Sequence, residues 1–458
     1  MKKAANEDKT ILFEQTPVPK AVMTLAVPTI ISSLVMVIYN LADTYFVGMV
    51  NDPVQNAAVA LAGPVLLAFN AINNLFGVGS SSMMSRALGK KDYDTVYRSS
   101  AFGFYCALIS GIFFSVVYTL FHTSWLNILG ASQETAAATG EYLKWTVTFG
   151  AVPAILNVVM AYLVRAEGAS LHASIGTMSG CLLNILLDPF FILPWGLNMG
   201  AAGAGLATFL SNCVACAYFF VLLFVKKNST YVCIKPSMFG LQKRIVTGVC
   251  GVGIPASIQN LLNVTGMTVL NNFTSSYGSN AVAAMGIAQK INMVPLYIAL
   301  GLSQGIMPLI SYNYASGNIP RMKKALTFSV KISLSAMVIM SAVFYFEADF
   351  LIALFMKNEG IIEYGSRFLQ GLCLGLAFLC MDFLAVGVFQ ACGMGRKAFI
   401  FALLRKIVME IPALFILNHF FPLYGLAYAQ FVTEVILAIA AIIVLKNLFD
   451  GLMKKSEQ

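Results

Sequence analysis

The stretch that decides the fold is residues 21–48, AVMTLAVPTIISSLVMVIYNLADTYFVG. At about 1.5 Å per residue, it forms a helix long enough to cross a hydrocarbon core of about 30 Å. Its one acid, Asp43, falls roughly 30 Å along the helix when counted from Met23, in the half of the bilayer opposite the N-terminus. An ionisable group there costs at least a few kcal/mol, so we expect it to face a cavity or a partner. In the alternative interpretation the helix ends earlier and Asp43 is solvated, but residues 44–47 continue the apolar run.

The composition indicates a polytopic membrane protein. Of the 458 residues, 59% are hydrophobic and 11% are charged, whereas soluble domains carry about 25% charged residues. Residues 1–20 lack the pattern of a cleavable signal peptide, so we expect the first helix to stay in the mature protein. The nine cysteines form no paired framework, and we interpret Cys213 and Cys216 as packing residues inside a helix.

Apolar stretches of spanning length recur twelve times and predict an all-α membrane protein. They cover residues 21–48, 56–87, 99–121, 140–164, 171–194, 200–225, 246–274, 281–313, 325–346, 364–391, 397–419 and 423–449. The predicted organisation is a cytoplasmic arm (1–20), a six-helix bundle (21–225), a cytoplasmic linker (226–244), a second six-helix bundle (245–449) and a cytoplasmic tail (450–458).

The net charge of +9 reflects membrane orientation and not a nucleic-acid partner. With these spans, every Lys and Arg falls on one side of the membrane except Lys144, Lys290, Lys357 and Arg367. The positive-inside rule then places both termini in the cytoplasm.

The two halves of the chain resemble each other. Pro28 opens the first half as Pro255 opens the second, 227 residues later, and Pro189 falls opposite Pro412 with a shift of 223. Because six helices return the chain to the same side, the halves are predicted to be parallel repeats that can rock around a central site, which is a transporter plan. The sequence has no G-x-x-x-x-G-K-[ST] motif for ATP, so uphill transport would draw on an ion gradient.

Four polar residues are predicted to meet at similar depth in the first bundle. Asp188 lies roughly 24 Å from the cytoplasmic end of its helix, and Asn184, one turn earlier, shares its face. Thr208 lies about 12 Å from the outer end of the next helix, and the glycine-rich run at residues 200–205 lets that helix approach closely. With Asp43, these groups offer hard oxygen ligands suited to a proton or Na⁺.

Two acids close together in a low-dielectric pocket cannot both ionise cheaply, so the pair is suited to hold and release a proton or a cation during a cycle. Pro28 and Pro189 lie on the helices that carry the acids and are candidate hinges. The alternative interpretation is that Asn184 and Thr208 only satisfy each other and that the prolines are fixed kinks.

At these motifs the chain resembles the multidrug and toxic compound extrusion (MATE) transporters, and within them the bacterial DinF-like branch. The resemblance covers nearly the whole chain, and it is specific because several motifs agree. They are Tyr39-Asn40-Leu41-Ala42-Asp43, Ser85-Arg86-Ala87-Leu88-Gly89, Leu183-Asn184-Ile185-Leu186-Leu187-Asp188-Pro189, Gly203-Ala204-Gly205-Leu206-Ala207-Thr208 and Gln390-Ala391-Cys392-Gly393.

The resemblance implies export of amphipathic, often cationic drugs coupled to inward flow of H⁺ or Na⁺, with both ions open. It implies a cation site at Asp43, Asn184, Asp188 and Thr208, bending of the first helix at Pro28, and a place in the bacterial cytoplasmic membrane. The NorM-like branch carries a glutamate where this chain has Asn263, so we place ion coupling in the first half.

Five further residues are candidates for contacts in a substrate cleft: Tyr39, Asn40, Asn157, Lys290 and Glu410. Glu410 is alternatively a second proton site. Equally, the charged residues of the second half, which also include Asp382, Arg405 and Glu434, can pair among themselves or extend toward the membrane surface.

The expected partners are small organic substrates and membrane lipids, with no cofactor other than the coupling ion, no nucleic acid and a monomeric chain. The nearest alternative function is a lipid-linked oligosaccharide flippase of the same wider superfamily, which would need a strongly basic cavity. An ion channel or an intramembrane enzyme is the alternative of another class, and the sequence has no clustered His, Ser or metal-ligand constellation for an enzyme.

Overall fold

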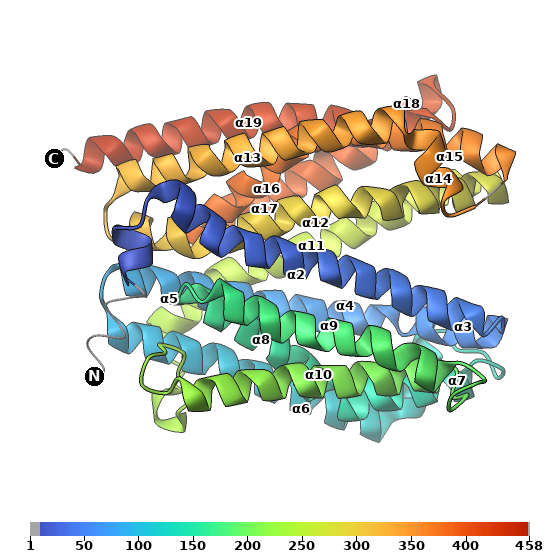
Figure 1. The fold of residues 1–458 in the computed structure, drawn as a ribbon, viewed down its shortest axis with the longest axis horizontal. Coiled ribbons are helices and arrows are strands. Elements are labelled where there is room, and N and C mark those ends of the chain that lie inside the picture. The colour runs from blue at the N-terminus through green and yellow to red at the C-terminus, as the bar shows by residue number, and fades with distance from the viewer. Residues whose placement is uncertain (1–9, 357, 457–458) are drawn as a thin grey trace. The chain divides into compact units, whose positions relative to one another are not determined.

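A computed structural model describes residues 10–356 and 358–456, and every predicted span is helical in it (Figure 1). The described residues contain no β-strand. Nine continuous helical stretches within this part of the chain are long and apolar enough to cross a membrane, and two bent helix pairs also qualify. The remaining predicted span, 397–419, is covered by three consecutive shorter helices. The all-α membrane fold expected from the sequence is therefore confirmed.

Two compact units divide the chain, and each contains most of one predicted bundle. Unit 1 comprises Ile31–Ser257 and the described residues up to Gln15, and unit 2 comprises Thr16–Ile30 and the residues from Ile258 onward. The predicted bundles of 21–225 and 245–449 follow chain order. In the structure, by contrast, the helices that begin each half start in one unit and continue in the other.

The helices of unit 1 follow one another closely. They are α2 (Val18–Met49), which begins in unit 2, then α3 (Pro53–Leu61), α4 (Gly63–Ile72), η1 (Asn73–Val78), α5 (Gly79–Gly89), α6 (Tyr93–Ile128), α7 (Ala136–Leu143), η2 (Lys144–Phe149), α8 (Ala151–Ala166), α9 (Ser170–Ile192) and α10 (Ala201–Val225). The segments η1 and η2 are π-helical, a local widening that often accompanies functional sites.

The helices of unit 2 begin within α11 (Lys243–Ser275), whose first part belongs to unit 1. They continue with α12 (Ser279–Ala315), α13 (Ile319–Phe346), α14 (Ala348–Ala353), α15 (Glu359–Cys373), α16 (Leu376–Ala391), α17 (Gly395–Leu403), η4 (Leu404–Glu410), α18 (Ile411–Phe420) and α19 (Gly425–Ser456). A core of buried apolar residues on α12, α15, α16 and α19 holds this unit together.

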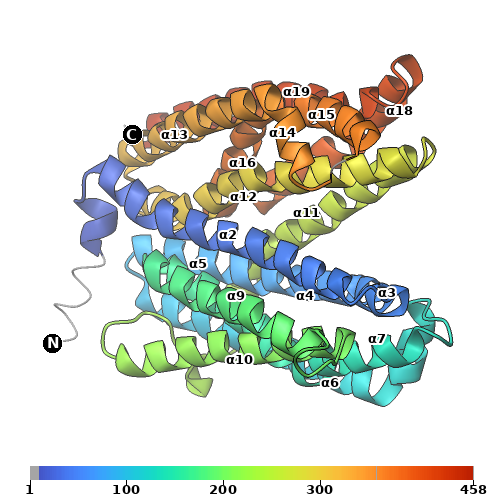
Figure 2. The ribbon, with the colours of Figure 1, turned by 45° about the vertical axis from the view of Figure 1, so that its right-hand side comes forward.

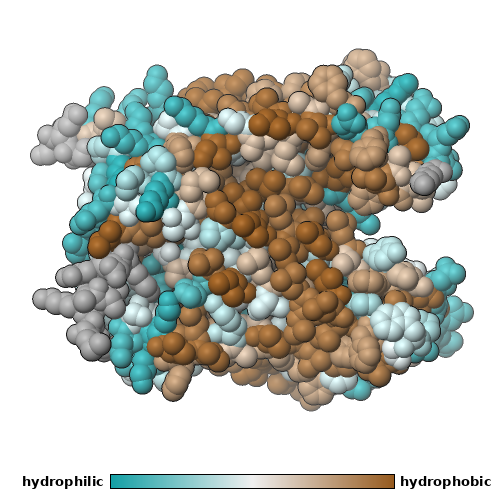
Figure 3. Space-filling model, viewed as in Figure 1, coloured by the Kyte–Doolittle hydropathy of each residue, from teal (hydrophilic) through white to brown (hydrophobic). Residues whose placement is uncertain are grey.

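The internal repeat is visible in the fourth span of each half. In the first half, α7 and η2 together meet α8 at 52°, and in the second half α15 meets α16 at 48°. The second limb starts at Ala151 in one case and at Leu376 in the other, 225 residues apart. Within each unit, apolar side chains cover the middle of the helices and polar ones gather toward the ends on the face drawn in Figure 3, as expected for membrane helices.

The linker between the halves is held to unit 1 by hydrogen bonds. Ser100 Oγ donates to the Cys233 carbonyl (3.2 Å) and accepts from the Cys233 N–H (2.9 Å). The buried Glu167 carboxylate accepts the Tyr231 N–H (2.5 Å). At the end of the linker, Arg244 pairs with Asp92 (3.1 Å). Hydrogen bonds from Thr95, together with Arg244, hold the pKa of the Asp92 carboxyl below its usual value.

Glycines let α10 pack against its neighbours in unit 1 at close range (Figure 2). A Cβ at Gly203 would lie 2.5 Å from the Phe191 carbonyl oxygen of α9, and one at Gly205 would lie 2.9 Å from the Tyr142 carbonyl oxygen of α7. Backbone atoms cannot move aside as a flexible side chain can. The close approach predicted from the run at 200–205 is therefore present.

We expect the substitution Gly203→Ala to lower the melting temperature of the purified protein, because forcing an atom into a packed site costs about 1–3 kcal/mol. The matched control is Gly251→Ala in α11, where a Cβ meets nothing within 4 Å and alanine favours the helix. Thermal unfolding in detergent checks the pair. Equal melting temperatures for the two variants would contradict the packing argument.

Candidate functional site

Asp188 and Asn184 lie one turn apart on the inward face of α9, and both side chains are buried. The Asn184 amide is oriented by its surroundings, because the Asp188 carboxylate lies on one side and the Thr208 backbone N–H on the other. Its nitrogen donates to the two Asp188 oxygens at 2.7 and 3.3 Å, and its oxygen accepts from Thr208 N at 3.1 Å. The amide thus fixes the carboxylate and joins α9 to α10.

Thr208 completes this group from α10. Its Oγ1 lies 3.3 Å from the same Asn184 amide oxygen that accepts the Thr208 N–H. The residue reaches this position because Gly203 and Gly205, one turn earlier, allow α10 to approach α9 and α7. The structure therefore brings together the three residues that the sequence placed at one depth on two helices.

Asp43 approaches the same group from α2. Its side chain is partly buried, and its Oδ1 is enclosed without a hydrogen-bond partner. The Asp43 and Asp188 carboxylates lie close enough for their charges to repel each other. All four predicted ion-site residues belong to unit 1.

Two tyrosines stand beside these acids. Tyr142, on α7, is buried and lies within electrostatic reach of both Asp43 and Asp188. Tyr39, one turn before Asp43 on α2, is also within reach of both. No sequence motif marks Tyr142, although it falls at the start of a predicted span, and Tyr39 is predicted to line a substrate cleft. Both phenols are placed to act with the acidic pair.

No cation balances this acidic pair within residues 10–356 and 358–456. Neither carboxylate makes an ion pair with a described residue, and the described charge that acts on Asp188 is that of Asp43. Two carboxylates, an amide and a hydroxyl are oxygen-rich ligands of the kind that hard cations prefer. A proton shared between the acids, or a bound Na⁺, would remove the uncompensated charge.

The other predicted cleft residues are dispersed. Asn157 is buried in unit 1, where its amide nitrogen donates to Asn212 Oδ1 (3.0 Å) and to the Pro153 carbonyl (2.7 Å). Asn157 therefore links α8 to α10, and its contact with a substrate stays a prediction. Asn40 is exposed on α2, and Lys290 is half-buried in unit 2 without an ion-pair partner among the described residues.

The remaining charges of the second half pair among themselves, as one of the two interpretations held. The buried Arg405 contacts Glu434 (2.6 Å) and Asp382 (3.5 Å) and lies 5.0 Å from the centre of the Phe383 ring. Glu410 is paired with Lys406, the residue after Arg405. The Glu410 carboxylate therefore has a cation beside it, and its roles in a cleft or as a second proton site stay predictions.

The two candidate hinge prolines differ in position. Pro28 lies inside α2, just before the chain passes from unit 2 to unit 1 after Ile30. Pro189 lies inside α9 but only three residues before the helix ends at Ile192. Pro189 is therefore close to a helix terminus, whereas Pro28 has helix on both sides.

An all-α membrane protein built from two related units, with an oxygen-lined acidic site buried among its helices, has the features of a membrane transporter. The MatE family model matches residues 28–190 and again residues 255–416, one match for each repeat. The chain belongs to this family, that of the MATE transporters.

Individual relatives agree with this assignment. The chain is 36% identical over 451 residues to the multidrug export protein MepA of Staphylococcus aureus (strain MRSA252), with 97% of each chain covered. It is 34% identical to MepA of Staphylococcus saprophyticus, again with 97% of each covered. Among solved structures it is similar to the outward-facing conformation of a multidrug resistance MATE family transporter of the MOP superfamily, with a TM-score of 0.91, 27% identity, and 97% and 98% of the two chains covered.

We expect the substitution Arg405→Met to destabilise the protein by about 3–5 kcal/mol, because it leaves Asp382 and Glu434 buried without a counter-charge. In contrast, Lys144→Met removes an exposed pair with Glu141 (3.3 Å) and should cost at most about 1 kcal/mol. Thermal unfolding of purified protein measures both.

The triple variant Arg405→Met, Asp382→Asn, Glu434→Gln separates charge from packing. It removes both buried acids together with the arginine, so we expect it to regain part of the stability that Arg405→Met loses. A triple variant no more stable than Arg405→Met would show that the arginine acts through packing alone.

Proposed function

We propose that this protein exports amphipathic, often cationic organic compounds in exchange for H⁺ or Na⁺, by alternating access. The multidrug export proteins and the multidrug resistance transporter to which it is similar support the substrate class. The coupling ion would bind at Asp43, Asn184, Asp188 and Thr208.

One observation carries the ion-coupling proposal: Asp43 and Asp188 lie within electrostatic reach of each other among membrane helices, with no cation beside them in the described parts of the chain. A fixed pair of like charges in a low-dielectric site is expensive. An ion or a proton taken from the outer side would neutralise the pair and favour one conformation. Its release to the inner side would favour the other.

In this proposal, binding of the ion is coupled to movement of the units through α2. Asp43 lies on the part of α2 that belongs to unit 1, whereas Pro28 lies on the part that belongs to unit 2. Proline removes one backbone hydrogen bond and weakens the helix locally. Thr29, the next residue, donates its hydroxyl to the Leu25 carbonyl (2.9 Å), a contact that favours bending.

We expect Asp43→Asn and Asp188→Asn each to abolish ion-driven efflux, because an amide keeps the shape of the site and cannot carry the charge that a proton or Na⁺ neutralises. The matched control is Asp94→Asn, which removes an exposed acid that pairs with Arg98 at the start of α6. Efflux of a fluorescent organic cation from proteoliposomes is the measurement, with equal reconstitution verified for each variant. Wild-type efflux from either of the two site variants would refute the proposal.

The same preparation identifies the coupling ion. A pH gradient and a Na⁺ gradient are imposed separately on wild-type proteoliposomes, and the one that drives efflux is the coupling gradient. If efflux proceeds equally with neither gradient, the protein is a passive pathway and the exchange mechanism is wrong.

A further inference from the structure

An apolar groove of about 530 Å³ lies in unit 2, at the end of α19 marked C in Figure 1. Val18 and Pro19 at the start of α2, Met453 near the end of α19 and one face of α13 line it. The residues from α13 recur at the spacing of a single helical face: Pro320, Lys323, Lys324, Thr327, Phe328 and Lys331.

Three unpaired cations border this groove. Lys323, Lys324 and Lys331 are exposed, and none forms an ion pair or hydrogen bond with any residue that the structure describes. No Asp or Glu is among the described residues that line the groove. Lys331 lies eight residues after Lys323, about 12 Å farther along α13, so the ammonium groups extend along the groove and do not gather at one point.

The combination of an apolar floor and a cationic border matches one kind of occupant. The positive-inside rule by itself explains why lysines lie at the end of a membrane helix. It does not explain why these three lysines share one face of α13 with Phe328 along the groove. Ammonium groups attract phosphate at the membrane surface, and an apolar channel leading away from them accommodates acyl chain. The long Lys331 side chain can extend back toward the membrane surface.

We propose that this groove binds an anionic phospholipid. Its phosphate lies between Lys323 and Lys324, and an acyl chain follows the apolar floor past Phe328. Because Val18 and Pro19 form one wall, the bound lipid holds the start of α2 to α13 and α19.

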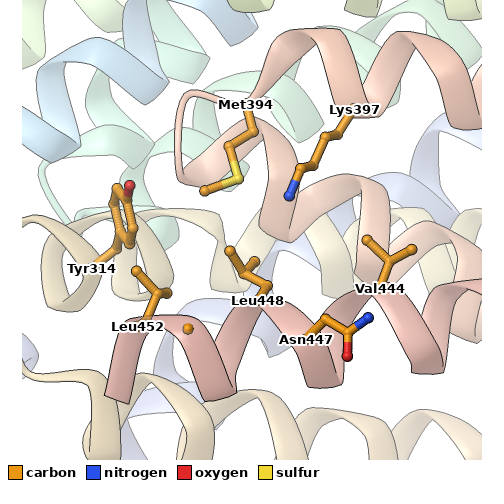
Figure 4. A pocket seen from close by; sticks show the side chains of 8 residues that line it. Tyr314, Met394, Lys397, Val444, Asn447, Leu448 and Leu452 are labelled. Carbon is orange, nitrogen blue, oxygen red and sulfur yellow. The ribbon is translucent and has the colours of Figure 1, made fainter. Parts of the chain in front are cut away.

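A second hollow of unit 2 provides the comparison. It measures about 450 Å³ and lies among Tyr314, Met394, Lys397 and Leu448, and Lys397 is the one lysine among its described lining residues (Figure 4). It is similar in size and also borders α19, but it lacks the row of cations. Loss of Lys397 is therefore a matched control for loss of charge in this part of unit 2.

The test counts lipids retained by purified full-length protein in native mass spectrometry, after titration with dioleoylphosphatidylglycerol or with dioleoylphosphatidylcholine in detergent. Wild type should retain one phosphatidylglycerol with clear preference over phosphatidylcholine. The variant K323Q/K324Q/K331Q should bind it at least tenfold more weakly, since each lysine near the surface contributes roughly fivefold. K397Q should bind like wild type.

A charge-preserving variant, K323R/K324R/K331R, keeps the proposal falsifiable if the glutamine variant fails to fold. It should retain the preference for phosphatidylglycerol. Equal retention of the two lipids by wild type would overturn the proposal, as would equal binding by wild type and the folded glutamine variant. Equal weakening by K397Q would show a non-specific attraction of the whole surface and would also overturn it.

Discussion

A carboxylate buried among membrane helices must be neutralised, and the two units of this protein do so differently. In unit 2, Arg405 lies between Glu434 and Asp382, and Lys406 binds Glu410, so each of these three acids has one of two cations of the chain beside it. In unit 1, no described cation stands beside Asp43 and Asp188. These acids of unit 2 have ion-pair partners within the chain, whereas those of unit 1 require a proton or a cation from outside it. This difference is why we place coupling in unit 1.

The geometry of the acidic site depends on small residues at a distance from it. Gly203 and Gly205 bring α10 against the backbones of α9 and α7, and this approach places the Thr208 N–H within hydrogen-bonding distance of the Asn184 amide. The amide in turn donates to both oxygens of Asp188. An ion site needs ligands fixed by such supporting contacts, and here the support comes from helix packing as much as from the polar residues.

The depth of the ion-site residues could be predicted from the sequence because they lie on regular helices. A constant rise per residue placed Asp188, Asn184 and Thr208 at one depth before any fold was known. Prediction failed where the outcome depended on tertiary contacts. The hydrogen bond from Asn157 to Asn212 joins two helices and could not be predicted from either one, and Tyr142 gave no signal because its position beside the acids depends on which helices meet.

The exchange of segments between units could not be predicted for a similar reason. Hydropathy is continuous through Pro28 and Pro255, and only the packing shows that α2 and α11 each leave one unit and enter the other within three residues of the proline. Both places also carry a hydroxyl that bonds the helix backbone, Thr29 to Leu25 and Ser257 to Gly253. The chain passes between the units at residues 15–16, within α2 and within α11, so any relative movement of the units has to be absorbed at these three places. Of these, only α2 also carries an acid of the candidate ion site. In the proposed mechanism, a change of charge at Asp43 is therefore transmitted along the helix that is weakened at Pro28.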